Sequence, residues 1–313
     1  MIKKIFSFIV AITFVFSTVS CGVSNNSSKD NIKLNSNILQ KDKSDTTVKK
    51  PEKNRETSTN VAPTEKKESK IVNTVNKSVY QNTQTLDNTT YGWGMRVLPD
   101  HKTPEITSLA MKLIKKYDGI FTGDTSKKVV YLTFDEGYEN GYTPQILDIL
   151  KENNVKAAFF VTGPYIKEKG DLVKRMVEEG HIVGNHSVNH YSMPSLSDEK
   201  VKEEINKLAD MFKNLTGKEM HYFRPPKGEY SERTLYLTQQ LGYKTVFWSI
   251  ALADWKPLPG GPDESYNTVM KRLHPGAVIL LHAVSKDDTL ALDKIIKDIK
   301  AQGYEFKTLD DIK

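Results

Sequence analysis

From residue 91 to the C-terminus, short hydrophobic runs rich in β-branched and aromatic residues recur along the chain. Runs of this kind are typical of strands that are buried on both faces. We expect buried strands at residues 129–134, 157–161, 181–184, 221–223, 244–249 and 277–281, with a seventh around 304–306.

Between these runs, hydrophobic residues recur with the spacing of amphipathic helices. The pattern predicts helices at residues 103–117, 143–153, 171–179, 197–215, 231–241, 266–273 and 287–301. Strands that alternate with helices pair in parallel through βαβ crossovers. Seven such strands suit a closed or nearly closed α/β barrel, with the first helix packed outside it. A flat, doubly wound sheet fits the same pattern, because strand order cannot be deduced from the alternation alone.

The N-terminal part of the chain has a different pattern. Lys3 and Lys4 precede an apolar run at residues 5–19, and small residues end this run before Cys21, as in a secretory signal peptide. The run is short for a membrane span. Because Thr-Val-Ser-Cys at residues 18–21 also resembles a bacterial lipobox, we expect a signal peptide at residues 1–20 and lipidation of Cys21. An ordinary signal peptide that contains a cysteine is the alternative, and both predict export.

Composition separates a polar tether from a folded domain. Residues 21–90 are mainly Asn, Ser, Thr and Lys, so they lack the apolar surface that a core requires. The net charge of +6 arises within residues 1–90, where 14 basic residues face 8 acidic ones. The neutral remainder argues against nucleic acid as a partner. We expect an extension at residues 91–127 that packs on the barrel, a catalytic domain at residues 128–313, and a monomer.

Cys21 is the single cysteine, which excludes an internal disulfide and a zinc site built from cysteines. Chemically capable side chains instead follow the predicted strands. In α/β barrels and in open α/β sheets, this edge is where ligands bind. The residues concerned are Asp135 and Glu136, Asn185 and His186, Arg224, Asp254 and Trp255, and His282.

Two histidines in this set have the spacing of metal ligands. His186 and His190 are four residues apart, which can place both imidazoles on one face of a helical turn. Two histidines and one carboxylate, from Asp135 or Glu136, would leave coordination positions open for water and substrate. A hydrated surface pair is the alternative for the histidines, and a solvated turn is the alternative for the carboxylates.

The remaining residues suit acid–base chemistry. Arg224 precedes two prolines that fix its backbone, and a fixed guanidinium beside a carboxylate keeps that carboxylate ionised. His282 ends an apolar strand, and Asp254 could orient it as a general acid. A structural cap for Arg224 and a core position for His282 are the alternatives.

Taken together, these residues resemble the five motifs of the NodB-type polysaccharide deacetylases, which form carbohydrate esterase family 4. The motifs are Thr133-Phe134-Asp135-Glu136, His186-Ser187-Val188-Asn189-His190, Arg224-Pro225-Pro226-Lys227-Gly228, Asp254-Trp255 and Leu280-Leu281-His282.

The resemblance implies a distorted (β/α)7 barrel that removes N-acetyl groups from sugars with a divalent metal ion, for which zinc is the expected choice. It implies that Asp135 is the base and that His282, oriented by Asp254, is the acid. The metal would lie on His186 and His190. Lys227, Trp255 and Leu280 would bind substrate, through a backbone N–H near Lys227 and an acetyl pocket.

The first motif departs from the family pattern, because Glu136 stands where a second aspartate usually binds the metal. Glu136 has one more methylene group and could still reach the ion, or the histidines and water could hold it. The family members that make muramic δ-lactam also lack that aspartate.

Longer stretches, among them Tyr91-Gly92-Trp93-Gly94, resemble the de-N-acetylases that make muramic δ-lactam in the cortex of bacterial spores. This resemblance implies action on N-acetylmuramic acid in peptidoglycan glycan strands. With a lipid anchor, the protein would face outward from the cytoplasmic membrane, or lie in the cell wall or the spore intermembrane space.

Three other functions fit parts of the sequence. They are a general peptidoglycan N-acetylglucosamine deacetylase, an inactive carbohydrate-binding lipoprotein on the same fold, and a glycoside hydrolase. A hydrolase of the last kind needs two carboxylates and no metal, so sensitivity to chelators separates it from a deacetylase.

Overall fold

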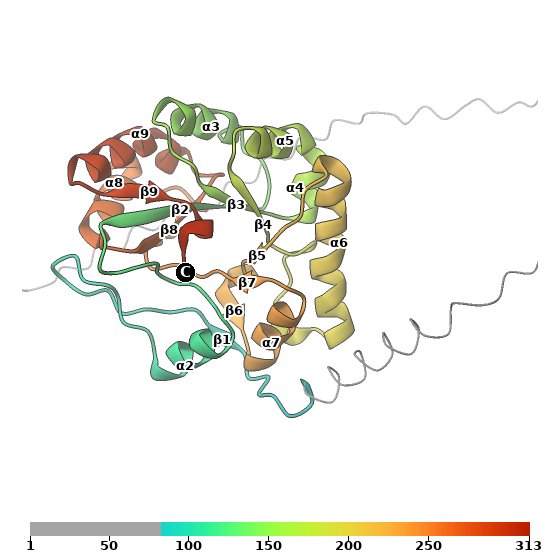
Figure 1. Ribbon diagram of the computed structural model, residues 1–313. Coiled ribbons are helices and arrows are strands. Elements are labelled where there is room, and N and C mark those ends of the chain that lie inside the picture. The colour runs from blue at the N-terminus through green and yellow to red at the C-terminus, as the bar shows by residue number, and fades with distance from the viewer. Residues whose placement is uncertain (1–82) are drawn as a thin grey trace, which may run out of the picture. The chain divides into compact units, whose positions relative to one another are not determined.

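The computed structural model describes residues 83–313 (Figure 1). The expected signal peptide, Cys21 and most of the expected tether lie outside these residues. Asn88 Nδ2 donates a hydrogen bond to Pro194 O over 3.0 Å, and the Arg233 N–H donates to Asp87 O over 3.1 Å. Asp87 and Asn88 therefore contact the folded domain, although their composition is that of the tether. None of the helices in the described part of the chain is long and apolar enough to cross a membrane.

Seven parallel strands form the central sheet. Their order is β7-β5-β4-β3-β2-β8, and β9 pairs with β2 outside this order. The strands are β2 (Val129–Glu136), β3 (Ala158–Val161), β4 (Ile182–Asn185), β5 (Tyr222–Phe223), β7 (Lys244–Thr245), β8 (Ala277–His282) and β9 (Glu305–Lys307).

The two ends of this order meet. Ile250, in the segment after β7, forms a parallel bridge with Ile279 of β8, and the Leu280 N–H donates to Ile250 O over 2.9 Å. The sheet is therefore curled into a barrel, which confirms the expected fold and excludes the flat sheet.

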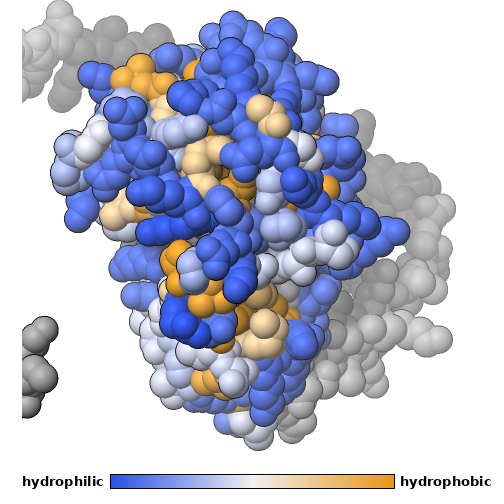
Figure 2. Space-filling model, turned by 90° about the vertical axis from the view of Figure 1, so that its left-hand side faces the viewer, coloured by the Kyte–Doolittle hydropathy of each residue, from blue (hydrophilic) through white to orange (hydrophobic). Residues whose placement is uncertain are grey.

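Helices surround the barrel, as Figure 1 shows for α3, α5, α6, α8 and α9. The helices are α2 (Ser108–Lys116), α3 (Thr143–Glu152), α4 (Gly163–Glu168), α5 (Gly170–Glu178), α6 (Asp198–Thr216), α7 (Glu232–Gln240), α8 (Gly261–Arg272) and α9 (Lys286–Ala301). Short 3₁₀ turns lie at Met193–Ser195, Pro226–Gly228 and Leu309–Asp311. The surface in Figure 2 is mainly hydrophilic, with hydrophobic residues gathered in a patch in its lower half.

The helices differ from the prediction in three places. Helix α8 starts five residues earlier than expected, because Pro262 occupies its first turn and two acidic residues follow it. Helix α2 starts later, because the Thr107 side chain accepts a hydrogen bond from the Ala110 N–H and caps the helix there. Helix α4 was missed, since its six residues are too few to show a helical period.

The segment before the barrel packs on it through a second, two-stranded sheet. Strand β1 (Tyr91–Gly92) pairs antiparallel with β6 (Glu229–Tyr230). The Trp93 ring stacks on Phe247 with centroids 4.2 Å apart, and Trp93 Nε1 donates to Trp248 O over 3.0 Å. These contacts bring residues 91–93 to one side of the barrel mouth.

Residues of each strand alternate between the barrel interior and the layer of helices. In β2, Tyr131 packs inside with Phe160 and Val278, whereas Leu132 and Phe134 pack in the cluster that the outer helices share. This alternation decides which of the polar side chains at the strand ends enter the mouth of the barrel.

Gly184 of β4 leaves room for an aromatic ring inside the barrel. A Cβ atom at this position would lie 2.5 Å from the Phe160 ring. That distance is well inside van der Waals contact, so a larger residue has to displace the ring from a densely packed interior.

We predict that Gly184→Ala lowers the free energy of unfolding by about 1–3 kcal/mol, the usual cost of overpacking a core. Gly92→Ala is the matched control, because a Cβ at Gly92 meets nothing within 4 Å. Denaturant unfolding of both variants measures the effect, and equal stability of the two would contradict the packing described for Phe160.

Candidate active site

A buried ion pair lies at the carboxyl end of β2. Arg224 Nη1 is 2.7 Å from Asp135 Oδ1, and the Arg224 side chain is fully buried. The guanidinium also donates to Thr133 Oγ1 over 2.9 Å and to Val246 O over 3.2 Å. It lies 4.1 Å from the centre of the Phe160 ring. These contacts hold the guanidinium in one position against the carboxylate.

The charges around Asp135 keep it ionised. Burial favours the neutral carboxyl, but the guanidinium of Arg224, together with the nearby imidazoles of His186 and His282, outweighs burial and holds the pKa of Asp135 below its ordinary value. Burial also lowers the pKa of Arg224, yet a guanidinium stays protonated at neutral pH. An ionised carboxylate that opens into a cavity can accept a proton from water.

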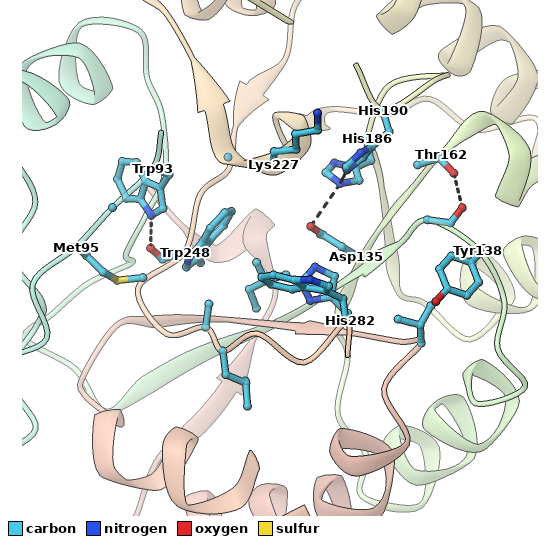
Figure 3. Close-up of a pocket in the computed structure, with 18 of the residues that line it drawn as sticks. Trp93, Met95, Asp135, Tyr138, Thr162, His186, His190, Lys227, Trp248 and His282 are labelled. Carbon is cyan, nitrogen blue, oxygen red and sulfur yellow. Dashed lines mark hydrogen bonds and ion pairs between the residues drawn. The ribbon is translucent and has the colours of Figure 1, made fainter. Parts of the chain in front are cut away.

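Two imidazoles face each other above this carboxylate (Figure 3). Because a carbonyl oxygen only accepts, His186 Nδ1 donates to Arg224 O over 2.8 Å, and Nε2 of His186 is left with a free lone pair. His190 Nε2 lies 3.2 Å from that nitrogen. Burial lowers the pKa of both histidines, that of His190 to about 4, so both are neutral near pH 7.

The two histidines do not lie on the helical turn that their spacing would allow. Residues 186–190 form a loop in which Ser187 and His190 have φ angles of 64° and 57°. The Asn189 N–H donates to Glu204 Oε2 over 2.7 Å, and Asn189 Nδ2 donates to Glu204 Oε1 over 2.6 Å. Helix α6 thus anchors the loop through Glu204 and brings the imidazoles together without a helix.

The histidine pair fits a divalent metal ion. Two nitrogens that each bind zinc at about 2.0–2.1 Å in tetrahedral geometry stand a little more than 3 Å apart. Asp135 Oδ2 is 3.5 Å from His186 Nε2, so a carboxylate lies beside the same position. Residues 83–313 contain no cluster of three or more His, Cys, Asp or Glu side chains arranged to hold a metal. Two imidazoles are therefore the ligands that the described chain offers.

Glu136 does not join the histidines, contrary to the expectation that it is a metal ligand. Alternation along β2 turns it away from Asp135, into the layer of helices, where both carboxyl oxygens lie 3.4 Å from Thr143 Oγ1. Burial, together with the charge of Glu139, raises the pKa of Glu136 well above its ordinary value. The sequence carried this signal, because adjacent strand residues point to opposite faces.

His282 lies on the other side of Asp135 and is held by Asp254 (Figure 3). His282 Nδ1 is 2.7 Å from Asp254 Oδ1, and the His282 N–H donates to Asp254 Oδ2 over 2.7 Å. Burial lowers the pKa of His282, but its hydrogen bond to Asp254 and the charges of Asp254 and Asp135 reverse this effect, so the pKa lies above its ordinary value of 6.5. The imidazole can therefore carry a proton near neutral pH.

These groups open into a cavity of about 970 Å³. All three residues that sequence reasoning chose for substrate binding, Lys227, Trp255 and Leu280, line it, and the Trp255 ring packs edge-on against His282 with centroids 5.2 Å apart. Sequence reasoning missed several further lining residues. They are Trp93, Met95, Val97, Tyr138, Thr162, Trp248 and Arg272.

Some of these missed residues had a partial signal in the sequence. Trp93 and Met95 lie in the hydrophobic stretch that starts the folded domain, which was expected to pack on the barrel but not to reach the site. Trp248 lies inside a run predicted as strand, and alternation makes it an inward-facing position. Arg272 gave no signal, because the last turn of a helix commonly carries a basic residue.

Comparison with known proteins is consistent with this arrangement. A family model described as Polysaccharide deacetylase matches residues 122–246. Peptidoglycan-N-acetylmuramic acid deacetylase PdaA of Bacillus subtilis is 44% identical over 231 residues, which cover 73% of this chain and 88% of that protein. The chain belongs to the polysaccharide deacetylases of carbohydrate esterase family 4.

A solved structure and a second relative support the same assignment. The structure of Bacillus subtilis PdaA, a family 4 carbohydrate esterase, has a TM-score of 0.70 and 44% identity, and the match covers 72% of this chain and 98% of that one. A peptidoglycan-N-acetylglucosamine deacetylase of Bacillus cereus is 36% identical over 200 residues, which cover 63% of this chain and 72% of that protein. This polysaccharide deacetylase is thus a hydrolase that acts on carbon–nitrogen bonds, and enzymes of its family are generally metal-dependent.

We predict that His186→Ala and His190→Ala each weaken binding of a divalent ion by about 100-fold or more, because each removes one of two imidazole ligands. Calorimetric titration of zinc into the chelator-treated protein measures the affinity. His221→Ala is the matched control, since His221 is exposed and lies outside the cavity.

Chelation and both ligand substitutions should abolish deacetylation and leave thermal unfolding cooperative, because the barrel core does not involve the metal. Full turnover after exhaustive dialysis against chelator would refute a metal site on these histidines.

Proposed function

We propose that this enzyme removes the acetyl group from N-acetylmuramic acid in peptidoglycan whose stem peptide has been cut off, as a step toward the muramic δ-lactam of the spore cortex. The observation that carries the proposal is the position of Asp135. It is a buried, ionised carboxylate that lies between a pair of neutral imidazoles and a third histidine that holds a proton.

In this proposal Asp135 is the general base and His282 the general acid. Asp135 takes a proton from the attacking water, and Arg224 keeps it ionised for that role. An amine is a poor leaving group until it is protonated, so His282 gives it a proton. Asp254 fixes the ring through Nδ1, which leaves Nε2 of His282 to donate.

The cofactor in this proposal is a divalent ion on His186 and His190, with zinc as the expected metal for imidazole ligands. When bound, such an ion supplies Lewis acidity toward the acetamide carbonyl and toward water. The backbone N–H of Lys227 is proposed to stabilise the developing oxyanion. Trp255 and Leu280 are proposed to line the pocket for the acetyl methyl group.

Charge in the cavity favours an anionic sugar. Lys227 and Arg272 both line it, and neither forms an ion pair with any described residue. The acid that lines the same cavity, Asp135, is already neutralised by Arg224. N-acetylmuramic acid freed of its peptide carries a lactyl carboxylate, whereas N-acetylglucosamine has none, so two unpaired cations support the muramic substrate.

The same carboxylate explains the proposed product. Deacetylation creates an amine next to the lactyl group of one sugar, and ring closure between the two gains a large effective molarity. The relative PdaA, named for its action on N-acetylmuramic acid, supports this choice. The relative from Bacillus cereus, named for N-acetylglucosamine, supports the alternative of a general peptidoglycan deacetylase.

The proposed location is outside the cytoplasmic membrane, where peptidoglycan is found. It rests on the signal-like residues 1–20 and on Cys21, the proposed lipid attachment site, all of which lie outside the described residues. A tether between this anchor and the barrel would let the active site reach along a glycan strand.

We predict two separate limbs in the pH dependence of kcat/KM for acetate release. The acidic limb reports Asp135, whose pKa is lowered, and the basic limb reports His282, whose pKa is raised, so activity is expected to span neutral pH. Asp135→Asn should remove the acidic limb and His282→Ala the basic limb. Wild-type rates in Asp135→Asn would exclude it as the base.

We predict that the purified protein releases acetate from amidase-treated peptidoglycan and not from untreated peptidoglycan, because the peptide bond masks the lactyl carboxylate. Lys227→Met should reduce kcat/KM on the treated substrate more than on an N-acetylglucosamine oligomer, and Lys227→Arg should keep the preference. Equal release from both peptidoglycans, or release from glucosamine alone, would assign the protein to the general deacetylases.

A further inference from the structure

A buried carboxyl group that has no part in the proposed mechanism lies behind Asp254. Asp288 is in the first turn of α9 and is 1% exposed, and Asp254 is 2% exposed. Asp288 Oδ1 accepts a hydrogen bond from Ser265 of α8, and the Asp288 N–H donates to Ser285 Oγ over 3.2 Å. These contacts fix the Asp288 side chain between two helices.

The second oxygen of Asp288 is the unusual feature. Asp288 Oδ2 is buried and makes no hydrogen bond of normal geometry to any described residue. The neighbouring acid, Asp254, accepts from His282 on both of its oxygens. Burial raises the pKa of Asp288 well above its ordinary value, and the neighbouring Asp254 carboxyl group raises it further.

Within residues 83–313, no Lys, Arg or His side chain forms an ion pair with Asp288 that would offset an anion. Asp254 faces it from the loop before α8, and His282 lies beyond Asp254 with its Nδ1 already bound there. Helix α8 presents the neutral Ser265. On α9 itself, Lys286 is exposed, and Asp287 accepts from the Leu258 N–H over 3.0 Å.

We propose that Asp288 is a neutral carboxylic acid in the active enzyme, and that the hydroxyl group at its Oδ2 donates a hydrogen bond to Asp254. Asp288 is then a positioning residue, because it acts on the reaction through Asp254 and His282. This inference rests on the acid role proposed for His282.

A neutral Asp288 explains how His282 can both hold and release a proton. Two anions behind the imidazole would stabilise its charged form so strongly that it would give up a proton to the amine slowly. A single anion, Asp254, that accepts a hydrogen bond from a neutral donor keeps the His282 ring oriented. The imidazolium then remains acidic enough to protonate the amine. An apolar site can keep a carboxylic acid neutral at pH 7 so that it serves as a hydrogen-bond donor.

The alternative is that Asp288 is an ordinary ionised residue in the first turn of α9, where the helix dipole favours negative charge. The two possibilities make opposite predictions for Asp288→Asn. An amide replaces a neutral acid with a neutral donor, but it would remove a charge if Asp288 were ionised.

The test compares Asp288→Asn with Asp288→Leu in the full-length protein, by the pH dependence of acetate release. Asp288→Leu has no hydrogen-bond donor, so kcat should fall about 10-fold or more while KM changes little. The loss should not exceed the roughly 10²- to 10⁴-fold that a general acid contributes. Asp288→Asn should restore the rate and leave the basic limb where it is in the wild type. Ser265→Ala, which leaves Oδ2 untouched, is the control for disturbed packing.

A shift of the basic limb to lower pH in Asp288→Asn, or a wild-type rate in Asp288→Leu, would overturn the proposal. Infrared spectroscopy gives a measurement that does not depend on the substrate. The background is Glu136→Gln, which removes a second buried carboxyl group with a strongly raised pKa. In this background a protonated carboxyl band at neutral pH should be present and should disappear on adding Asp288→Asn. Absence of that band would refute the proposal even if the enzyme proves active, and its presence would support it even if the substrate is different.

Discussion

Asp135 and Arg224 form a buried ion pair across 2.7 Å, and the other groups of the site are arranged around this pair. Removing one partner of a buried ion pair costs about 3–5 kcal/mol, because the other charge is left without compensation. Here Thr133, a backbone carbonyl and the Phe160 ring complete the surroundings of the guanidinium. The Arg224 carbonyl also fixes the tautomer of His186, so one residue sets both the charge of the base and the lone pair of a metal ligand.

Four buried carboxyl groups of similar chemistry have different environments in and around this site. Asp135 contacts a guanidinium and is ionised. Glu136, the next residue along the strand, accepts hydrogen bonds from the Thr143 hydroxyl group and has a strongly raised pKa. Asp254 accepts two hydrogen bonds from His282, and one carboxyl oxygen of the neighbouring Asp288 has no hydrogen-bond partner among the described residues. Environment thus separates the proposed base from the two carboxyl groups whose pKa is strongly raised, Glu136 and Asp288, as expected where one fold carries out both acid and base chemistry.

The barrel was predictable because its strands are continuous apolar runs and because the polar residues follow the strand ends. The order of motifs likewise predicted that Asp135, His186, His190, Arg224 and His282 lie together at the carboxyl ends of the strands. The alternation along β2 is local information, so the outward position of Glu136 could have been predicted and was not. The loop that joins the histidines depends on Glu204 of α6, a contact between distant residues. The position of Trp93 at the cavity likewise depends on the pairing of β1 with β6. Tertiary contacts of this kind leave no periodic signal in the sequence.

The central claim is that Arg224 holds Asp135 ionised so that it can act as a base. The most direct test is the acidic limb of kcat/KM for acetate release in Arg224→Met, with cooperative unfolding checked in the same preparation. Without the guanidinium, the largest influence that opposes burial of the carboxyl is lost, so the account predicts that the limb moves to higher pH and that activity is regained as pH rises. A folded Arg224→Met protein whose acidic limb stays at the wild-type pH would contradict the account.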